Sequence, residues 1–269
     1  MFVVPSEVHG RADQMIELTR SLFLALFGLV AGSFLSVCIH RLPHGKSVVT
    51  PSSHCPCCGE WIRWFDNVPV FGYLALRGQC RHCHAPINPM YPAVEVVTPV
   101  LFLLQYQEVG FELLLVTRLV FTGAMIVLFA IDLQYRVLPN VVTIPGICSG
   151  LLFSCFVQPG WFDAVLGVVI GGVTLLAISE VYYRVRGEEG LGMGDVKMLA
   201  MIGAFLGWQP MLVTLALASF LGSIIGICAM RSASSGRKFT LPLGSFLAVA
   251  SIVVTLVGEP VIAWYMSLY

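Results

Sequence analysis

Long apolar runs separated by short polar segments dominate the pattern along the chain. Eight of these runs approach the roughly 20 residues that a helix needs to cross a bilayer. The sixth run is short, closes in a Gly-Trp-Gln-Pro turn at 207–210, and reaches only part-way unless it tilts. The second is interrupted by Glu95 and Pro99. The eight runs are 21–40, 92–107, 113–132, 138–157, 164–183, 196–208, 211–230 and 240–258.

This pattern predicts an all-α polytopic membrane protein with about eight transmembrane helices. Composition agrees, because only 11% of the 269 residues are charged and 57% are hydrophobic, whereas a soluble domain carries about 25% charged residues. A net charge of zero removes any bulk attraction to nucleic acid. The first run follows a short polar head, 1–20, and has no small-residue cleavage site soon after it, so we expect a retained span.

Basic residues gather in alternate loops, and this asymmetry predicts the orientation of the chain. The loops between them, near 108–112, 158–163 and 209–210, carry no lysine or arginine. The positive-inside rule places the basic loops in the cytoplasm and both termini outside, with Arg11 and Arg20 as exceptions. The basic loops are 40–91, 132–137, 184–197 and 231–239.

The polar stretch 41–91 is the one soluble region of any size. It divides the chain into an N-terminal segment with the first span (1–40), a cytoplasmic domain (41–91) and a membrane domain of about seven helices (92–269). A domain of about 50 residues buries too small a core to fold without a cross-link or a bound metal ion. Because the cytoplasm is reducing, we expect a metal ion rather than disulfide bonds to stabilise this domain.

Two Cys-x-x-Cys pairs in this region supply a candidate metal site. Cys55 and Cys58 form the first pair, and Cys80 and Cys83 form the second, with 21 residues between the pairs. Each pair presents two thiolates from one tight turn, so two pairs complete the tetrahedral shell of a structural zinc ion. The four cysteines inside apolar runs, Cys38, Cys148, Cys155 and Cys228, are interpreted as small buried side chains.

Other ligands compete for this site. Cys57 and three histidines lie in the same two segments, and a redox pair or unliganded thiols would also explain the spacing. The histidines are His54, His82 and His84.

Two aspartates are the candidate catalytic residues. Asp132 ends the third run and Asp195 opens the sixth, so the predicted topology puts both at the same membrane face. Each has a simpler explanation: Asp132 can pair with Arg136 at i,i+4, and Asp195 can cap a helix. Two such residues at one membrane face make the simpler explanations less convincing. An ionisable group at membrane depth costs free energy, and such groups are usually functional.

Close carboxylates share a proton, because both cannot ionise easily, and the pair can then work as general base and general acid in peptide hydrolysis. Gly192 and Gly194, beside Asp195, allow close approach of an extended peptide backbone. Lys197 either affects the ionisation of the Asp195 carboxylate or anchors the chain at the membrane interface.

These motifs resemble the type IV prepilin peptidases, membrane aspartyl proteases of the Gly-x-Gly-Asp class, over nearly the whole chain. "GSFLSVCIHRLP" at 32–43 is similar to the exit of the family's first span, and "DNVPVFGYLALRGQCRHCHAPINPMYPAVE" at 66–95 is similar to its cytoplasmic domain. "AIDLQYRVLPN" at 130–140 and "GMGDVK" at 192–197 match its two aspartate motifs.

The resemblance implies two activities at the bacterial inner membrane, with the active site facing the cytoplasm. One removes the basic leader of prepilins and pseudopilins, the subunits of type IV pili and type II secretion systems, after a glycine. The other N-methylates the new terminus with S-adenosylmethionine. Asp132 and Asp195 carry over as the protease pair, and Cys55, Cys58, Cys80 and Cys83 as the metal ligands. No Gly-x-Gly-x-Gly turn identifies the methyl-donor site, which is expected to use the 41–91 loop, near Gly78, together with the membrane face.

The chain departs from the family pattern at four places: Ser36, His40, Asn140 and "LPLGSFLA" at 241–248, a looser form of a Pro-Phe-Gly-Pro-Phe motif. Gly-Ser-Phe-Leu occurs both at 32–35 and at 244–247, and helix packing through small residues explains both copies. A proton-coupled transporter and a zinc-stapled adaptor without catalysis are the rival classes. A transporter favours midplane acids and an inverted repeat, and an adaptor leaves the aspartates unused.

Overall fold

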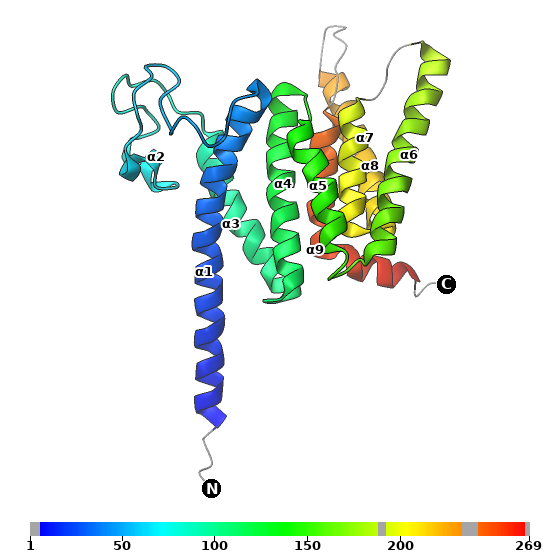
Figure 1. The fold of residues 1–269 in the computed structure, drawn as a ribbon, viewed down its shortest axis with the longest axis horizontal. Helices are drawn as coiled ribbons and strands as arrows, with labels where there is room; N and C mark the ends of the chain where they lie inside the picture. Colours follow the sequence, from blue (N-terminus) through cyan, green and yellow to red (C-terminus); the bar gives the residue numbers. More distant parts are fainter. Residues whose placement is uncertain (1–5, 188–191, 233–241, 267–269) are drawn as a thin grey trace. The chain divides into compact units, whose positions relative to one another are not determined.

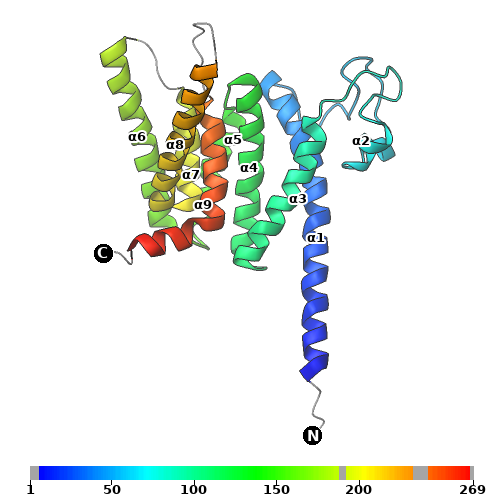
Figure 2. The same ribbon diagram turned by 180° about the vertical axis from the view of Figure 1, so that it is seen from behind.

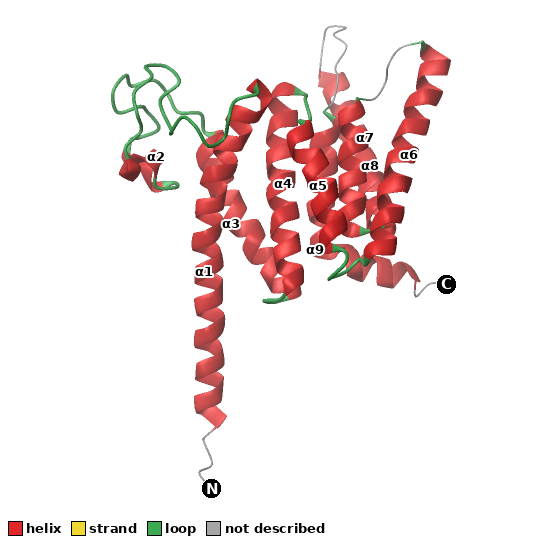
Figure 3. Ribbon diagram, viewed as in Figure 1, coloured by secondary structure: helices red, strands yellow, loops and turns green. Residues whose placement is uncertain are grey.

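The computed structural model describes residues 6–187, 192–232 and 242–266, and the side chains within 13–187, 192–228 and 242–257. Within these ranges the chain consists of helices and loops without a strand, which confirms the all-α class (Figure 3). The helices are α1 (Ser6–Arg41), η1 (Leu42–His44), η2 (Trp64–Asn67), α2 (Phe71–Ala75), α3 (Met90–Val109), α4 (Leu113–Tyr135), α5 (Asn140–Phe153), α6 (Trp161–Arg186), α7 (Met193–Leu206), α8 (Trp208–Ser232) and α9 (Leu243–Met266).

Each of the eight predicted runs is helical over most of its length. Among the residues that the structure describes, four helical stretches are long and apolar enough to cross a membrane, so the number of crossings predicted from the sequence is not confirmed. Part of the basic loop 231–239 lies outside the described residues. The four stretches are Asp13–His44, Leu113–Tyr135, Trp161–Arg186 and Trp208–Cys228.

The helix α6 shows why these stretches suit a bilayer. Only 22% of its apolar window is buried inside the protein, and Val165, Val169 and Val173 on it are exposed. A helix that is apolar all round yet mostly uncovered by protein needs an apolar solvent, because soluble proteins rarely expose contiguous apolar patches of this size. The exposed side chains therefore fit contact with lipid.

The chain divides into two compact units, 1–37 with 49–107 and 38–48 with 108–269. In the first unit α1 lies against α3, and a Cβ atom added to Gly28 would lie 2.5 Å from Cα of Pro99. The helix α3 continues through Pro99, so the interruption expected at Glu95 and Pro99 does not end it. The Glu95 carboxylate accepts a 2.7 Å hydrogen bond from the backbone N–H of Val70, in the polar loop.

The second unit is a bundle of α4 to α9 in which α7 is central (Figures 1 and 2). The helix α7 packs against α5, α6, α8 and α9, and nearly all of its residues from Val196 to Phe205 are buried. It ends at Gly207, whose φ of 81° turns the chain directly into α8, as the turn motif predicted. The helix is short and apolar because protein surrounds it.

The crossing of α6 and α7 depends on two glycines that face each other. A Cβ atom on Gly167 would lie 2.4 Å from the carbonyl oxygen of Gly203, and one on Gly203 would lie 2.3 Å from the carbonyl oxygen of Gly167. Small residues at such a crossing let two helix backbones touch. This contact holds α7, and with it Asp195, in place within the bundle.

Candidate functional site

The first Cys-x-x-Cys pair sits in a tight turn closed by backbone hydrogen bonds. The N–H of Cys55 donates to the carbonyl of Glu60 at 2.9 Å, and the N–H of Gly59 donates back to the carbonyl of Cys55 at 2.9 Å. Gly59 has a φ of 74°, a left-handed conformation that glycine adopts without strain. The turn directs Cys55 and Cys58 toward the same point.

The second pair repeats this geometry. The N–H of Cys80 donates to the carbonyl of Ala85 at 2.9 Å, and the N–H of His84 donates to the carbonyl of Cys80 at 3.0 Å. His84 has a φ of 57°, so it fills the turn position that Gly59 fills in the first pair. Gly78 belongs to the same turn, since its carbonyl accepts the N–H of Ile87 at 2.8 Å.

The four thiols form one cluster suited to a metal ion. The sulfur atoms of Cys55, Cys58, Cys80 and Cys83 all lie within 4.8 Å of one another, and the Cys55 and Cys83 sulfurs are 3.8 Å apart. Four thiolates at about 2.3 Å from a tetrahedral zinc ion lie about 3.8 Å from one another, so the spacing fits zinc. Backbone N–H groups of Cys83 and His82 lower the pKa of the Cys80 thiol to about 6, whereas burial and the neighbouring thiols raise the pKa of Cys83, so Cys80 is the thiol that ionises first.

The competing ligands lie outside this cluster. Cys57 is exposed and is not part of the four-thiol group. A ring nitrogen of His54 lies 3.0 Å from the carbonyl oxygen of Ser52, and His84 serves as the turn residue described above. Among the described residues, the geometry therefore selects the four cysteines that the two pairs predicted.

In the second unit, Asp132 lies near the end of α4 with only 5% of its surface exposed. Its Oδ2 atom accepts two hydrogen bonds from Ser245 of α9, from the backbone N–H at 2.6 Å and from the hydroxyl at 2.9 Å. Arg136 has left the helix, with a φ of 54°, and its backbone N–H caps the carbonyl oxygen of Asp132 at 2.9 Å. The strongest contacts of the Asp132 carboxylate thus come from another helix and not from an i,i+4 partner.

Asp195 lies in the first turn of α7. The residue that caps this helix is Gly192, so the simpler explanation of Asp195 as a helix cap does not hold. The reason is that the helix begins at Met193, three residues before the apolar run. As the third helical residue, Asp195 still lies at the positive end of the helix dipole.

The bundle brings the two carboxylates close enough for an electrostatic interaction between Asp132 and Asp195. Leu138 packs against the start of α7 and the start of α9. A Cβ atom on Gly194 would lie 2.9 Å from Cβ of Leu138, and one on Gly244 would lie 3.0 Å from Cδ1 of Leu138. The two aspartates that the sequence singled out are therefore neighbours.

The two glycines beside Asp195 have different surroundings. Gly194 has no room for a side chain because Leu138 occupies that space, so its close approach is to the protein itself. Gly192 is exposed, and a Cβ atom there would lie 3.6 Å from Oδ2 of Asp195, which leaves the carboxylate open on that side. Gly190 and Leu191, earlier in the same motif, lie outside the described residues.

Lys197 binds neither aspartate in the contacts described. Its ammonium group donates a 2.9 Å hydrogen bond to the side-chain oxygen of Asn140, the first residue of α5. Asn140 was noted only as a departure from the family pattern. This bond ties the start of α5 to the start of α7, close to Asp195 in the sequence.

Sequence reasoning missed Ser245 and Gly244. A Cβ atom on Gly244 would lie 3.0 Å from Oδ2 of Asp132, so the glycine lets the start of α9 approach the carboxylate. The sequence feature that includes both residues is the Gly-Ser-Phe-Leu stretch at 244–247, which by itself indicates only small residues at a helix contact. Its link to Asp132, 113 residues earlier, exists only in the folded chain.

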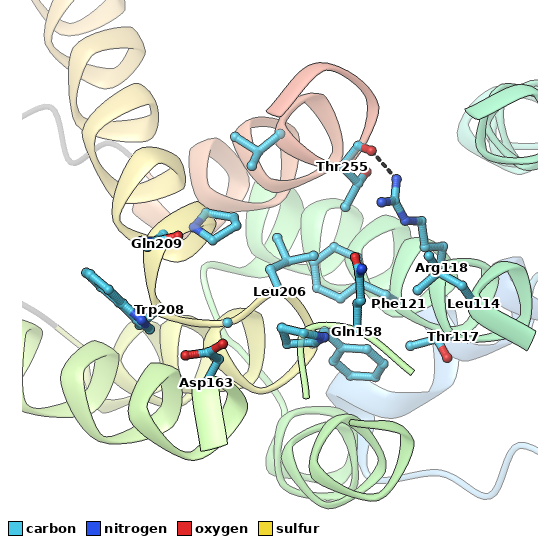
Figure 4. A pocket seen from close by; sticks show the side chains of 15 residues that line it. Leu114, Thr117, Arg118, Phe121, Gln158, Asp163, Leu206, Trp208, Gln209 and Thr255 are labelled. Carbon is cyan, nitrogen blue, oxygen red and sulfur yellow. Dashed lines mark hydrogen bonds between the residues drawn. The ribbon is translucent and has the colours of Figure 1, made fainter. Parts of the chain in front are cut away.

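A cavity of about 370 Å³ lies at the opposite ends of α4 and α7 (Figure 4). It is lined by Arg118 and Thr117 of α4, Asp163 of α6 and Trp208 of α8, among others, and Arg118 donates to the backbone carbonyl of Thr255. Neither predicted site contributes to it. The chemistry predicted from the sequence thus lies away from this cavity.

Paired carboxylates held by three helices inside an apolar bundle place the chain in a class of helical membrane proteins with an acidic centre. Comparison with known proteins gives the family within that class. Residues 26–109 match the model of the bacterial peptidase A24 N-terminal domain, and residues 119–227 match that of the type IV leader peptidase family. The chain belongs to the type IV leader peptidase family.

Three relatives, each named prepilin leader peptidase/N-methyltransferase, support this assignment. The Pseudomonas aeruginosa protein is 34% identical over 269 residues, covering 90% of this chain and 92% of the relative. The Klebsiella pneumoniae protein is 42% identical over 205 residues, covering 73% and 90%. The Myxococcus xanthus protein is 38% identical over 208 residues, covering 77% of this chain but only 62% of that longer relative. No solved structure gives a significant match.

Proposed function

We propose that the chain removes the basic leader of type IV prepilins and pseudopilins after a glycine and then N-methylates the new terminus with S-adenosylmethionine. Family membership and the names of the relatives support both activities. The observation that carries the peptidase mechanism is the interacting pair of carboxylates, Asp132 and Asp195.

In this mechanism the ionised carboxylate takes a proton from water as the water oxygen attacks the carbonyl carbon of the scissile peptide bond. The protonated carboxylate donates its proton to the carbonyl oxygen, which gives a neutral tetrahedral diol. On collapse of the diol, the carboxylate that gained the water proton passes it to the leaving nitrogen. The other carboxylate recovers its proton from the diol hydroxyl. No covalent intermediate with the protein is required.

The thiol cluster has a structural role in this proposal. Cys55, Cys58, Cys80 and Cys83 would hold a zinc ion in a closed four-sulfur shell, which leaves no open position for water. When bound, the ion stabilises the folded loop, because its binding free energy becomes folding free energy. No residue is assigned to the methyl donor, and Gly78 is accounted for by the second cysteine turn.

The proposed setting is the bacterial inner membrane, with the chain as a multi-pass protein in contact with the bilayer and the aspartates at the cytoplasmic face. The distribution of basic loops supports this orientation. We also propose the three-part division into 1–40, 41–91 and 92–269, with about eight crossings. The shorter helices α5 and α7 would complete the crossings, α7 within the bundle and α5 at its surface.

The test is incubation of the protein in membranes with a prepilin-derived peptide, with and without S-adenosylmethionine, read by mass spectrometry. We expect cleavage after glycine, and a methyl group on the new terminus only when the donor is present. Asp132→Asn and Asp195→Asn should each lower cleavage by at least about 10³-fold, because the pair acts as a unit.

Asp163→Asn is the matched control, since it neutralises an aspartate of the same unit that lines the cavity at the opposite ends of α4 and α7. It should cleave at the wild-type rate. Substantial cleavage by either Asn variant at position 132 or 195, with wild-type folding, would exclude the aspartyl mechanism.

A further inference from the structure

We propose that residues 68–76 of the polar loop dip into the lipid leaflet on the side of the thiol cluster, so that α2 lies among acyl chains rather than in water. The partner of this surface is the bilayer itself, with anionic phospholipids at its border. The inference rests on the proposed membrane setting and is independent of the peptidase activity. It limits the soluble part of the loop to the residues outside 68–76.

The segment 68–76 is an apolar stretch within the polar loop. Its sequence, Val-Pro-Val-Phe-Gly-Tyr-Leu-Ala-Leu, contains no charged residue. Phe71 and Leu74, both on α2, are 67% and 63% exposed, and Val68 is exposed as well. Apolar side chains exposed in one short stretch favour an apolar environment. Nine residues are too few to cross a bilayer, which takes about 20, so the segment can enter only one leaflet.

Glu95 holds this segment at the level of a membrane helix. The backbone N–H of Val70 donates to the Glu95 carboxylate at 2.7 Å. Glu95 in turn packs against α1, since a Cβ atom added to Gly32 would lie 2.9 Å from Cα of Glu95. Gly32 lies eight residues, about 12 Å along the helix, before the end of the predicted run 21–40, and the exposed Phe34 lies beside it. Figure 1 shows α2 at the level of α1 and not beyond its end.

The contact between Val70 and Glu95 is specific. Val70 has a φ of 63°, which β-branched residues rarely adopt. Such a conformation persists where surrounding contacts fix it, and the hydrogen bond to Glu95 is such a contact. A carboxylate at membrane depth is costly and is usually functional. The role of Glu95 in this inference is to hold 68–76 against α3.

The backbone of the segment meets the requirement that lipid imposes. No water replaces a missing partner in the bilayer core, so amide groups there must bond within the protein. The Val70 amide donates to Glu95. Four further amides donate to carbonyl oxygens two to four residues earlier, at 2.6 to 3.0 Å, and they belong to Phe71, Gly72, Leu74 and Leu76. The segment can therefore enter lipid without leaving these groups unpaired.

The residues at the border of the segment favour lipid over a peptide. Arg63 and Arg77 are exposed on either side of it, whereas the Asp66 carboxylate is paired with Arg81. Exposed arginines at a membrane surface attract anionic headgroups, and they would repel the basic leader of the proposed substrate. Trp64, which is 82% exposed, adds the amphipathic ring that is typical of the membrane–water interface. An apolar centre bordered by arginine and tryptophan is the composition of an interfacial anchor.

The test is photo-crosslinking of the full chain in vesicles of phosphatidylethanolamine and phosphatidylglycerol, without substrate. Benzoylphenylalanine is incorporated in place of Phe71, which keeps an aromatic ring at this position, and the adducts are identified by mass spectrometry. A probe at Glu60 is the control, because Glu60 is an exposed residue of the same loop outside the segment. A probe at Val30, exposed on α1, gives the yield of a residue that faces lipid.

We expect the Phe71 probe to form lipid adducts at least about tenfold more often than the Glu60 probe, and within about threefold of the Val30 probe. Glu95→Ala should lower the lipid yield at Phe71 by at least about threefold, because the Val70 amide would lose its partner in lipid and the segment would move toward water. Glu95→Gln keeps an acceptor oxygen and should retain most of the yield.

A lipid yield at Phe71 no higher than at Glu60 would overturn the inference. Adducts of the Phe71 probe with residues 108–269 would contradict it as well, because the chain itself would then cover the segment. So would adducts that move from lipid to an added prepilin-derived peptide, which would make the segment a substrate surface. An unchanged lipid yield in Glu95→Ala would exclude Glu95 as the anchor. Cleavage is not measured, so a chain that fails to cut the peptide would end the proposed function and leave these results standing.

Discussion

The thiol cluster and the carboxylate pair are built in opposite ways. All four thiols come from two turns within 53–87, and backbone hydrogen bonds inside each turn shape the cluster. The carboxylate site takes one residue from each of α4, α7 and α9, and its hydrogen bonds join residues 113 positions apart. The first site needs a short stretch of chain, whereas the second needs the whole bundle.

This difference indicates which change would disrupt each site. The loop has little apolar core. The metal that its thiols can bind would supply the stabilisation that a core gives elsewhere. The carboxylate pair depends on helix crossings such as the one at Gly167 and Gly203, where backbones touch. Perturbing one site should therefore leave the other intact.

Metal removal should produce the largest effect, and only on the thiol site. Chelation should speed hydrogen exchange at the knuckle amides of Cys55, Gly59, Cys80 and His84 by more than about 100-fold, because the ion supplies the folding free energy of the loop. Amides of α7 should keep their protection. Elemental analysis of the untreated protein should give one zinc per chain, and equal loss of protection in α7 would contradict the separation.

A methyl group at the α6–α7 crossing should produce the next largest effect, on the carboxylate site alone. Gly167→Ala places a Cβ atom 2.4 Å from a backbone oxygen, so it should destabilise the bundle by about 3 kcal/mol and lower cleavage. Gly172→Ala, on the same helix with open space around it, should be neutral or slightly stabilising. Thermal unfolding in detergent measures both.

Zinc content should be the same in the two variants. If Gly167→Ala melted like Gly172→Ala, the close crossing would not be what holds α7 in place.

The smallest effect is expected at the Asp66–Arg81 ion pair, which braces the loop outside the two turns. The guanidinium of Arg81 donates to both carboxylate oxygens of Asp66, at 2.5 Å and 2.8 Å, and it lowers the pKa of Asp66. A lowered pKa means that the stabilisation is complete above the ordinary carboxyl pKa of about 4 and is lost as pH falls through the lower value in the folded loop.

At neutral pH, Asp66→Asn should speed exchange of the loop amides by less than about fivefold, because Arg81 is 43% exposed. Glu60→Gln, a charge change at an exposed side chain of the same loop, is the control and should have no effect. If Asp66→Asn lowered the hydrogen-exchange protection of the loop amides as much as chelation does, the ion pair, and not the metal, would be what stabilises the loop.

Predictions from the sequence succeeded where one local rule applied. The Cys-x-x-Cys spacing identified the thiol group, and the apolar runs identified the helices. The alternative explanation of Asp195 as the cap of α7 failed because a helix can begin inside a glycine-rich segment that has no apolar pattern. The packing of Gly194 could not be predicted for a related reason, since its neighbour Leu138 lies far away in the sequence.

The sequence by itself determined the helices, the two cysteine turns and the presence of two aspartates at helix ends, because spacing, hydropathy and backbone hydrogen bonding act over a few residues. Only the tertiary structure decided that Asp132 lies close enough to Asp195 to interact electrostatically, and that Ser245 binds Oδ2 of Asp132. Such contacts depend on how closely helices cross, and that distance is set by glycines and side chains on elements far apart in the chain.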